Sequence, residues 1–324
     1  MSKFNLSMRG RALLALIAAA AAGVVAFLAA GAPTAVASTS VQSAVSQNWA
    51  GYVASGKTFR SVSGSWTEPT VTASADSSQA YSAQWVGLGG ASNSSSSLEQ
   101  IGTGADYVNG QPDYYAWYEL VPASQVRLNM AIHPGDKISA RVSVSGTTVN
   151  LSLTDTTTGQ SVNKTLQMSN PDTSSAEWIV EAPAATSGAG DFQILPLADF
   201  SKVTFTSATA TADGHTGGIS DPEWSATRVQ LPTGSSGSAG GPGFMSTGYG
   251  SQQPSAGATT STLSGDGFSV SWQGDSASQS ASDPGASSGS YGYADGGSYG
   301  YGGGGYSYGG GYGYDPGAWA YGGA

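Results

Sequence analysis

The chain has 324 residues, of which only 10% are charged, with a formal net charge of −10 and a pI near 4.4. This acidic balance argues against a nucleic-acid partner, and the low charge density suits a protein that works in acid, where ionised Asp and Glu lose charge. The absence of cysteine excludes disulfides, thiol catalysis and cysteine metal sites.

The N-terminus has the three parts of a secretory signal: a basic region, an apolar run and small residues before a cleavage site. They are Lys3, Arg9 and Arg11, the run from Ala12 to Ala32, and Ala35 and Ala37 before Ser38. An uncleaved anchor is the alternative, but the Ala and Gly content favours cleavage after Ala37. Removal of residues 1–37 takes three of the 11 basic residues and none of the 21 acidic ones, leaving a net charge of −13. We expect a secreted, extracellular protein without stable membrane association.

The segment Leu98–Glu119 places a glutamine before a glycine-containing turn and an aromatic strand. Strand side chains alternate between faces, which puts Tyr115, Trp117 and Glu119 together. The other face carries Tyr114, Ala116 and Tyr118. Neither face reads as plain core. An aromatic surface with one carboxylate indicates a groove wall for an extended ligand, although these residues alone favour a plain edge strand.

Period-2 alternation of apolar residues, separated by turn-forming clusters, runs from about Val45 to Leu231. Val126, Leu128, Met130 and Ile132 alternate before the turn His133–Asp136, and Ile138, Ala140, Val142 and Val144 alternate after it. This pattern predicts an antiparallel hairpin. No segment keeps a helical apolar period over three turns. We therefore predict an all-β fold, with two packed antiparallel sheets favoured over a closed barrel.

The segment Ala176–Pro183 (AEWIVEAP) puts Glu177, Ile179 and Glu181 on one strand face, opposite Trp178 and Val180. A glutamate on an apolar strand is costly to ionise, so its pKa is expected to rise toward values useful in acid-base catalysis. A glutamate at a strand end is also ordinary surface, and this segment alone favours that interpretation.

The C-terminal part changes composition twice. The stretch 234–258 is rich in Gly, Ser, Pro and Gln and is predicted to be flexible, whereas Ser261–Trp272 regains alternation and is predicted to be the last strand. The folded domain is therefore expected to span 38–273. Residues 274–324 contain nine of the 16 tyrosines in a Gly/Ser/Tyr tract, predicted to be a disordered, self-associating or surface-adhering tail.

Histidine and metal chemistry have little support. His133 precedes Pro134 in a predicted turn and His215 lies in a predicted loop, so both are interpreted as solvated turn residues rather than members of a Ser-His-Asp triad. No HExxH motif, Asp/Asn calcium loop or histidine cluster occurs in the sequence. Carboxylates and amides remain as the candidate reactive groups.

These segments resemble the glutamic peptidases, or eqolisins, acid endopeptidases best known as secreted fungal enzymes. The similar stretches keep their order over about residues 46–273. They are NWAGY (48–52), AQWVGLGG (83–90), LEQIGTG (98–104), YYAWYE (114–119), HPGDKISARVSV (133–144), TTTGQSVNK (156–164), AEWIVEAP (176–183), LPLADFSKVTFT (195–206) and the strand ending at Trp272. The resemblance implies a lectin- or glucanase-like jelly roll of two antiparallel sheets, each of about seven strands.

By position, the resemblance assigns the catalytic residues to Gln100 and Glu181. It assigns the substrate cleft to Trp49, Trp85, Trp117 and Glu119. In this assignment Glu181 acts as a carboxylate that takes a proton from water and returns it to the leaving amine, while the Gln100 amide stabilises the oxyanion. No metal or cofactor is expected, the partners are protein or peptide substrates, and the enzyme is expected to be a monomer insensitive to pepstatin.

Three departures from the fungal pattern stand out. Gly89 replaces an aspartate that follows the cleft tryptophan in the fungal pattern. Only about ten residues separate Ala37 from Asn48, where fungal members carry a long propeptide. This chain also lacks the fungal disulfides and carries a Gly/Tyr-rich tail that the fungal enzymes do not have. Two alternatives stay open: a lectin-like sandwich that binds glycans, and a glycosidase that uses Glu119 and Glu181 as a carboxylate pair. The role of Gln100 distinguishes the peptidase from both alternatives, because only the peptidase needs the Gln100 amide.

Overall fold

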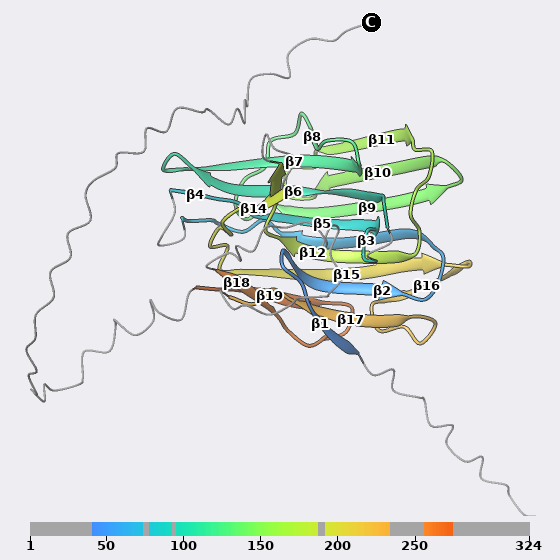
Figure 1. Ribbon diagram of the computed structural model, residues 1–324. Helices are drawn as coiled ribbons and strands as arrows, with labels where there is room; N and C mark the ends of the chain where they lie inside the picture. The colour runs from blue at the N-terminus through green and yellow to red at the C-terminus, as the bar shows by residue number, and fades with distance from the viewer. Residues whose placement is uncertain (1–40, 74–77, 93–94, 187–191, 234–255, 275–324) are drawn as a thin grey trace, which may run out of the picture. The chain divides into compact units, whose positions relative to one another are not determined.

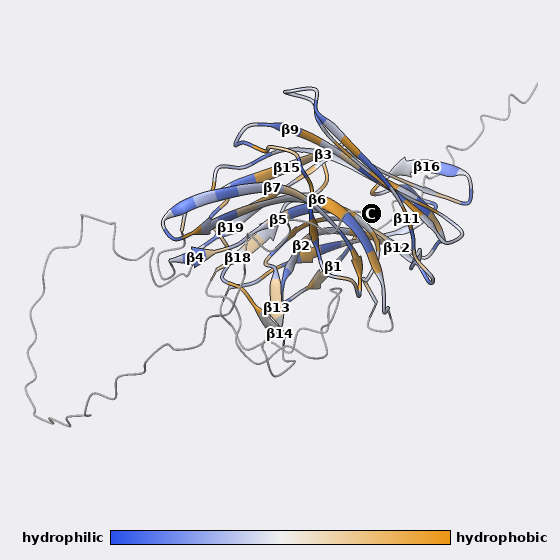
Figure 2. Ribbon diagram, turned by 90° about the horizontal axis from the view of Figure 1, so that it is seen from above, coloured by the Kyte–Doolittle hydropathy of each residue, from blue (hydrophilic) through white to orange (hydrophobic). Residues whose placement is uncertain are grey.

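The computed structural model describes residues 41–73, 78–92, 95–186, 192–233 and 256–274, and the fold is given for these residues (Figure 1). Their strands form two large sheets that lie face to face, as Figure 2 shows from above. The described ranges contain no helix, and hence none that could cross a membrane. The predicted all-β sandwich is confirmed. The predicted signal (1–37) and nearly all of the predicted tail lie outside the described residues.

The first sheet has nine strands. They are β1 (Gln42–Val45), β2 (Trp49–Ser55), β4 (Gln79–Ala80), β5 (Ala83–Gly89), β6 (Leu98–Val108), β7 (Gln111–Val121), β8 (Val126–Arg127), β12 (Ser175–Glu181) and β17 (Ser225–Gln230). The order across the sheet is β1-β17-β2-β12-β5-β6-β7-β8, with β4 also paired to β6. All neighbours are antiparallel except β1 and β17, which run parallel.

The second sheet has eight strands. They are β3 (Phe59–Thr67), β9 (Lys137–Ser145), β10 (Thr148–Asp155), β11 (Ser161–Gln167), β15 (Lys202–Ala212), β16 (His215–Gly218), β18 (Gly257–Thr260) and β19 (Phe268–Gln273). The order is β11-β10-β9-β3-β15-β19-β18, with β16 paired to β15. Short strands take both sheets beyond the expected seven: β4 and β8 in the first sheet and β16 in the second. A separate pair, β13 (Ala184–Thr186) and β14 (Phe192–Ile194), follows β12.

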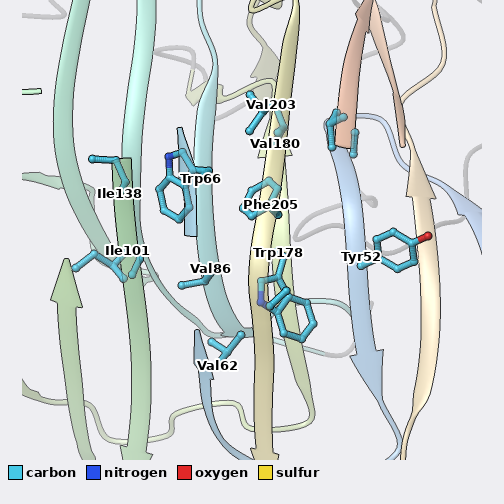
Figure 3. Close-up of a cluster of buried hydrophobic side chains, with 14 of the residues drawn as sticks. Tyr52, Val62, Trp66, Val86, Ile101, Ile138, Trp178, Val180, Val203 and Phe205 are labelled. Carbon is cyan, nitrogen blue, oxygen red and sulfur yellow. The ribbon is translucent and has the colours of Figure 1, made fainter. Parts of the chain in front are cut away.

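The core lies between the sheets and is built from one face of each. Figure 3 shows Trp66, Val86, Trp178 and Phe205 among its side chains. The Trp178 indole Nε1 donates to the Ser63 carbonyl at 2.8 Å, which satisfies the one polar atom of this side chain. Ala116 is buried in this core and Tyr114 packs against it, so one face of the aromatic strand is core, contrary to our interpretation of the sequence.

The predicted hairpin around His133 is wrong in its pairing. Residues Val126 and Arg127 pair with β7 of the first sheet, whereas β9 pairs with β3 and β10 of the second. The chain between them crosses from sheet to sheet. Its alternating side chains are still buried against the core, because a crossing segment between two sheets also has an inner side. Alternation therefore identified burial correctly but not the hydrogen-bonding partner.

Two further boundaries differ from the prediction. The expected flexible stretch 234–258 lies outside the described residues up to 255, but Gly257 and Ala258 are buried in β18 and paired with β19. The last predicted strand is shorter than expected and begins at Phe268, after a turn at Ser264–Gly267. In β19, Phe268 and Val270 point into the core, as their alternation predicted.

Candidate active site

A second apolar cluster covers the face of the nine-stranded sheet that points away from the main core, hereafter the outer face. Its members are Trp49, Val53, Ala83, Trp85, Leu98, Tyr115, Trp117, Val121, Ile179 and Val229. They come from five neighbouring central strands and from β17, whose alternate side chains face inward. The β13–β14 pair stands on this outer side in both views (Figures 1 and 2). All six residues assigned by resemblance, Gln100, Glu181, Trp49, Trp85, Trp117 and Glu119, lie on this face.

Glu181, the last residue of β12, is held by two donors. Trp85 Nε1 donates to its Oε2 at 2.7 Å, and Asn48 Nδ2 donates to its Oε1 at 3.1 Å. Trp85 is completely buried and packs edge-on against Trp49, with ring centroids 5.0 Å apart. Both carboxyl oxygens therefore have fixed directions, as a reacting group requires.

Burial, together with the charge of Glu119, raises the pKa of Glu181 to about 8 against the lowering effect of the bonds from Trp85 and Asn48. Burial wins, so Glu181 carries a proton throughout the acid range. The expected rise in pKa agrees with this value. The expected action of Glu181 as an ionised base in acid disagrees with this pKa, since a group that titrates near 8 is almost wholly protonated near pH 4.

Gln100 and Glu119 form the other half of the site. They face each other as paired residues of β6 and β7, and Gln100 Nε2 donates to Glu119 Oε2 at 2.7 Å. The Gln100 side chain is buried, and its Oε1 has no hydrogen-bond partner among the described residues. Burial raises the pKa of Glu119 to about 7 against the lowering effect of the Gln100 bond. Glu119 therefore orients an amide whose oxygen and second N–H stay available.

No hydrogen bond joins Gln100 to Glu181 among the described residues. They lie on strands separated only by β5, and the charge of Glu119 couples the two halves of the site. Trp117 belongs to the same outer-face cluster as Trp85. The arrangement leaves two oriented polar groups, a carboxyl and an amide, in an aromatic surrounding.

Glycines let the aromatic rings lie close to the sheet. A Cβ on Gly104 would lie 2.2 Å from Tyr115 Cζ, and one on Gly87 would lie 2.8 Å from Trp85 Cζ3. In the strand register, Glu181 of β12 pairs with Ala83 of β5, and Ala83 pairs with Gly104 of β6. Gly104 in turn pairs with Tyr115 of β7. Only a methyl group and a hydrogen therefore stand between the Glu181 and Tyr115 positions, which gives the outer face a shallow floor.

The outer face also carries a polar group beside Tyr115 that the sequence did not reveal. Arg127 lies 3.6 Å from the centre of the Tyr115 ring and donates to Asp113 Oδ2 at 2.8 Å. Tyr115 also bonds Asp106, whose pKa burial raises to about 7. Asn48 was likewise missed as a partner of Glu181. Its position directly before Trp49 carries no pattern that distinguishes it from a turn asparagine.

The space at Gly89 is taken by another carboxylate. A Cβ on Gly89 would lie 2.5 Å from the Cβ of Asp172, which belongs to the segment before β12. Asp172 accepts hydrogen bonds from Ser95 and from the Gly90 N–H. Asp172 therefore occupies the space that a side chain at position 89 would need.

The histidines lie away from this site. His133 is exposed in its turn beside Asp136, and His215, which begins β16 rather than lying in a loop, bonds Asp221 at 2.8 Å. Neither belongs to the outer-face cluster. Within the described residues no group of His, Asp and Glu is arranged to hold a metal ion.

Comparison with known proteins agrees with this geometry. The model of the Peptidase A4 family matches residues 47–238. Aspergillopepsin-2 of Aspergillus niger is 34% identical over 202 residues, 54% of this chain and 68% of that protein. Scytalido-glutamic peptidase with a transition-state analogue inhibitor superposes with a TM-score of 0.55 at 27% identity, and covers 69% of this chain and 98% of that one.

A second solved structure shares the fold to the same extent. SCP-B, a member of the eqolisin family in complex with the tripeptide Ala-Ile-His, is 27% identical, with a TM-score of 0.53 over 69% of this chain and 98% of that chain. The family match covers more than half of the chain and includes every strand of the outer face except β1. This chain therefore belongs to the Peptidase A4 family and is a glutamic-type endopeptidase.

Proposed function

We propose that the chain is a secreted endopeptidase that cleaves unfolded polypeptides in acid with Gln100, Glu181 and one water molecule, without metal or cofactor. The observation that carries this proposal is the pair of oriented groups on the outer face: Glu181 held by Trp85 and Asn48, and Gln100 held by Glu119. Trp49, Trp85 and Trp117 form the apolar surroundings in which a peptide group is removed from water.

Glu181 works as a neutral acid that both gives and takes a proton. As water adds to the scissile carbonyl carbon, one carboxyl oxygen accepts a water proton and the carboxyl O–H passes its proton to the carbonyl oxygen, which yields a gem-diol. In the second step Glu181 protonates the amide nitrogen and accepts a proton from one diol hydroxyl as the C–N bond breaks. Glu181 ends protonated, as it began, which fits its raised pKa.

Gln100 supplies polar contacts whose charge does not change with pH. One amide N–H is committed to Glu119, so the second N–H faces the developing negative charge on the carbonyl oxygen, and Oε1 accepts from the attacking water. A carboxylate at this position would repel the same charge. Glu119 is therefore a positioning residue for Gln100.

The proposed mature enzyme spans 38–273 and acts as a monomer on protein or peptide substrates. Export follows from the predicted signal at 1–37. Binding of a transition-state analogue by scytalido-glutamic peptidase supports an equivalent use of the outer face in this chain.

Cleavage of an acid-denatured protein substrate near pH 4, with pepstatin present, tests the proposal. We expect cleavage unaffected by pepstatin or by a chelator, and its loss in Glu181→Gln. Glu223→Gln is the matched control, because it makes the same chemical change at an exposed residue whose side chain pairs with Lys57 among the described residues. Cleavage abolished by pepstatin, or retained in Glu181→Gln, contradicts the proposed mechanism.

A further inference from the structure

A cavity of about 710 Å³ lies on the outer face beyond the catalytic groups. It is bounded by β1, β2 and β17, by the loop after β5 and by the segment before β12. The residues that matter here are Val53, Ala91, Ser95, Asp172, Ser174 and Ser175. None of the proposed catalytic or cleft residues lines it, so it is a separate compartment of the same face.

The cavity is continuous with the aromatic part of the outer face. Val53 belongs to the outer-face cluster that contains Trp49 and Trp85, and Ala91 packs against that cluster, while both also line the cavity. Ser175 lies on β12 six residues before Glu181, and the even spacing puts both on one face. At about 3.3 Å per residue the two positions are roughly 20 Å apart, a distance that about six residues of an extended peptide would span.

Two polar residues of the cavity wall stand out. Ser175 is 2% exposed, and its Oγ has no hydrogen bond of normal geometry among the described residues, although it lies close enough to Glu177 to affect its pKa. Asp172 accepts from Ser95, from the Gly90 N–H, and from the N–H and the side chain of Ser174. These bonds orient the carboxylate, and what it offers to a ligand is its negative charge.

The lining selects among ligands. Among the described lining residues there is no aromatic side chain on which a sugar ring could stack, and no Lys, Arg or His that would attract an anion. Asp172 is the one charged residue there. These donors and acceptors fit a polar side chain that carries N–H groups and a positive charge.

The carboxyl groups that face Asp172 are Glu99 from β6 and Glu177 from β12. Burial raises the pKa of Glu99 to about 8 and that of Glu177 well above its usual value, so both are neutral in acid. Hydrogen bonds from Ser95 and Ser174 hold the pKa of Asp172 below its usual value. Asp172 therefore stays ionised under the conditions in which the enzyme is proposed to act.

We propose that this cavity is a distal substrate subsite that receives a lysine or arginine side chain of a long polypeptide, about six residues from the scissile bond, against Asp172. The inference rests on the proposed peptidase function and adds its substrate class: extended polypeptides with a basic residue outside the segment that contacts the catalytic pair. Peptides too short to reach the cavity are cleaved without this contribution.

The test uses seven internally quenched peptides with one cleavable bond. Six are long and carry Lys, Ala or Glu at the sixth position from that bond, each in an N-terminal and a C-terminal version, and the seventh is too short to reach the cavity. In one of the two versions we expect kcat/KM near pH 5, where a peptide Glu is mostly ionised, to fall from Lys to Ala to Glu by about two- to fivefold per step, the range of a partly exposed ion pair. Added salt should reduce the difference.

Two variants assign the effect to the cavity. Asp172→Asn should cleave the short peptide normally but treat Lys and Glu peptides alike. Ser174→Lys, at an exposed position, keeps Asp172 in place and should reverse the order in favour of Glu. Glu223→Gln is the control for loss of one surface charge and should retain the order of the unaltered enzyme.

The outcomes separate the two proposals. If the short peptide is cleaved but the three long peptides are equivalent in both versions, or if their order is unchanged in Asp172→Asn and Ser174→Lys, the subsite is refuted and the peptidase function stands. If no peptide is cleaved, the short one included, the proposed function fails and the subsite fails with it.

Discussion

The two faces of the nine-stranded sheet use the same strands for opposite purposes. Toward the core, β12 presents Trp178 and Val180. The one polar side-chain atom of this pair, Trp178 Nε1, is bonded to a backbone carbonyl. Toward the outside, one residue away in each case, β12 presents Glu177, Ile179 and Glu181. The lesson is that a two-residue period lets one strand separate stability from chemistry, because a change on one face need not disturb the other.

Glu181→Gln should break the outer face most severely. It preserves size and keeps one of the two acceptor oxygens, so either Trp85 or Asn48 loses its acceptor. It also removes the proton that passes between water and the leaving amine, a contribution of about 10² to 10⁴ in rate or more. Turnover should fall by at least that factor while the unfolding midpoint in urea stays near that of the unaltered protein. Near-normal turnover of the folded variant would remove Glu181 from the mechanism.

Trp178→Ala should break the inner face. Trp178 is fully buried between the sheets, and truncation leaves a cavity and removes the hydrogen bond to the Ser63 carbonyl, at a cost of about 3–5 kcal/mol. Urea unfolding measures the loss. The surviving folded fraction should turn over normally, and a specific loss of turnover in fully folded protein would mean that the faces are coupled.

Gln100→Ala should lower turnover by about 10² to 10³ and change substrate affinity little, because the oxyanion contact is made only in the transition state. Gln100→Glu should fall at least as far despite its nearly identical shape, since an ionised carboxylate repels the developing charge and a protonated one offers only one donor. Separate measurement of kcat and KM decides the matter. A variant with normal kcat and raised KM would make Gln100 a groove residue rather than the oxyanion donor.

The sequence predicted which side chains share a strand face better than it predicted which strands or side chains pair with one another. Alternation correctly placed Glu177, Ile179 and Glu181 on one side of β12, because burial imposes a two-residue period on any strand. It could not show that Val126 pairs with β7, since a segment crossing between sheets is buried with the same period. The donors on Glu181 come from segments 96 and 133 residues away in the chain, and only the register of distant strands brings them together.

The pH dependence of stability should sharpen the contrast between a neutral buried carboxyl and a surface one. Burial raises the pKa of Glu68 to about 8, above that of an unfolded chain near 4.5, although the neighbouring polar groups of Thr103 and Trp66 lower it. The folded state therefore keeps a proton that the unfolded chain releases. Stability should be complete below pH 4.5 and decline by up to about 1.4 kcal/mol per pH unit for this group until pH 8.

Glu68→Gln checks the assignment, because glutamine imitates the protonated acid and does not titrate. Urea midpoints at pH 4 and pH 7 should lie closer together in this variant than in the unaltered protein. Glu223→Gln, at an exposed site, should leave the difference intact. An unchanged difference in Glu68→Gln would show that other groups control the pH response.

Ending the chain at Gln273 should have the smallest effect. Gln273 is the last residue of β19, so the change removes no described strand. We expect the thermal midpoint and kcat/KM of the shortened chain to match those of the chain that ends at residue 324. A markedly lower midpoint would show that residues after 273 pack on the sandwich.

Gly104 implies an unusual kind of fragility. Damaging substitutions in most proteins subtract atoms and leave holes, but the Tyr115 ring occupies the place where a Cβ on Gly104 would stand. Here the smallest possible gain, one methyl group in Gly104→Ala, would lift the ring and with it the Arg127 guanidinium that rests on its face. The outer face therefore has no space for an added side-chain atom at Gly104. A search for improved variants should leave such glycines unchanged, even where a larger side chain seems to have room above the sheet.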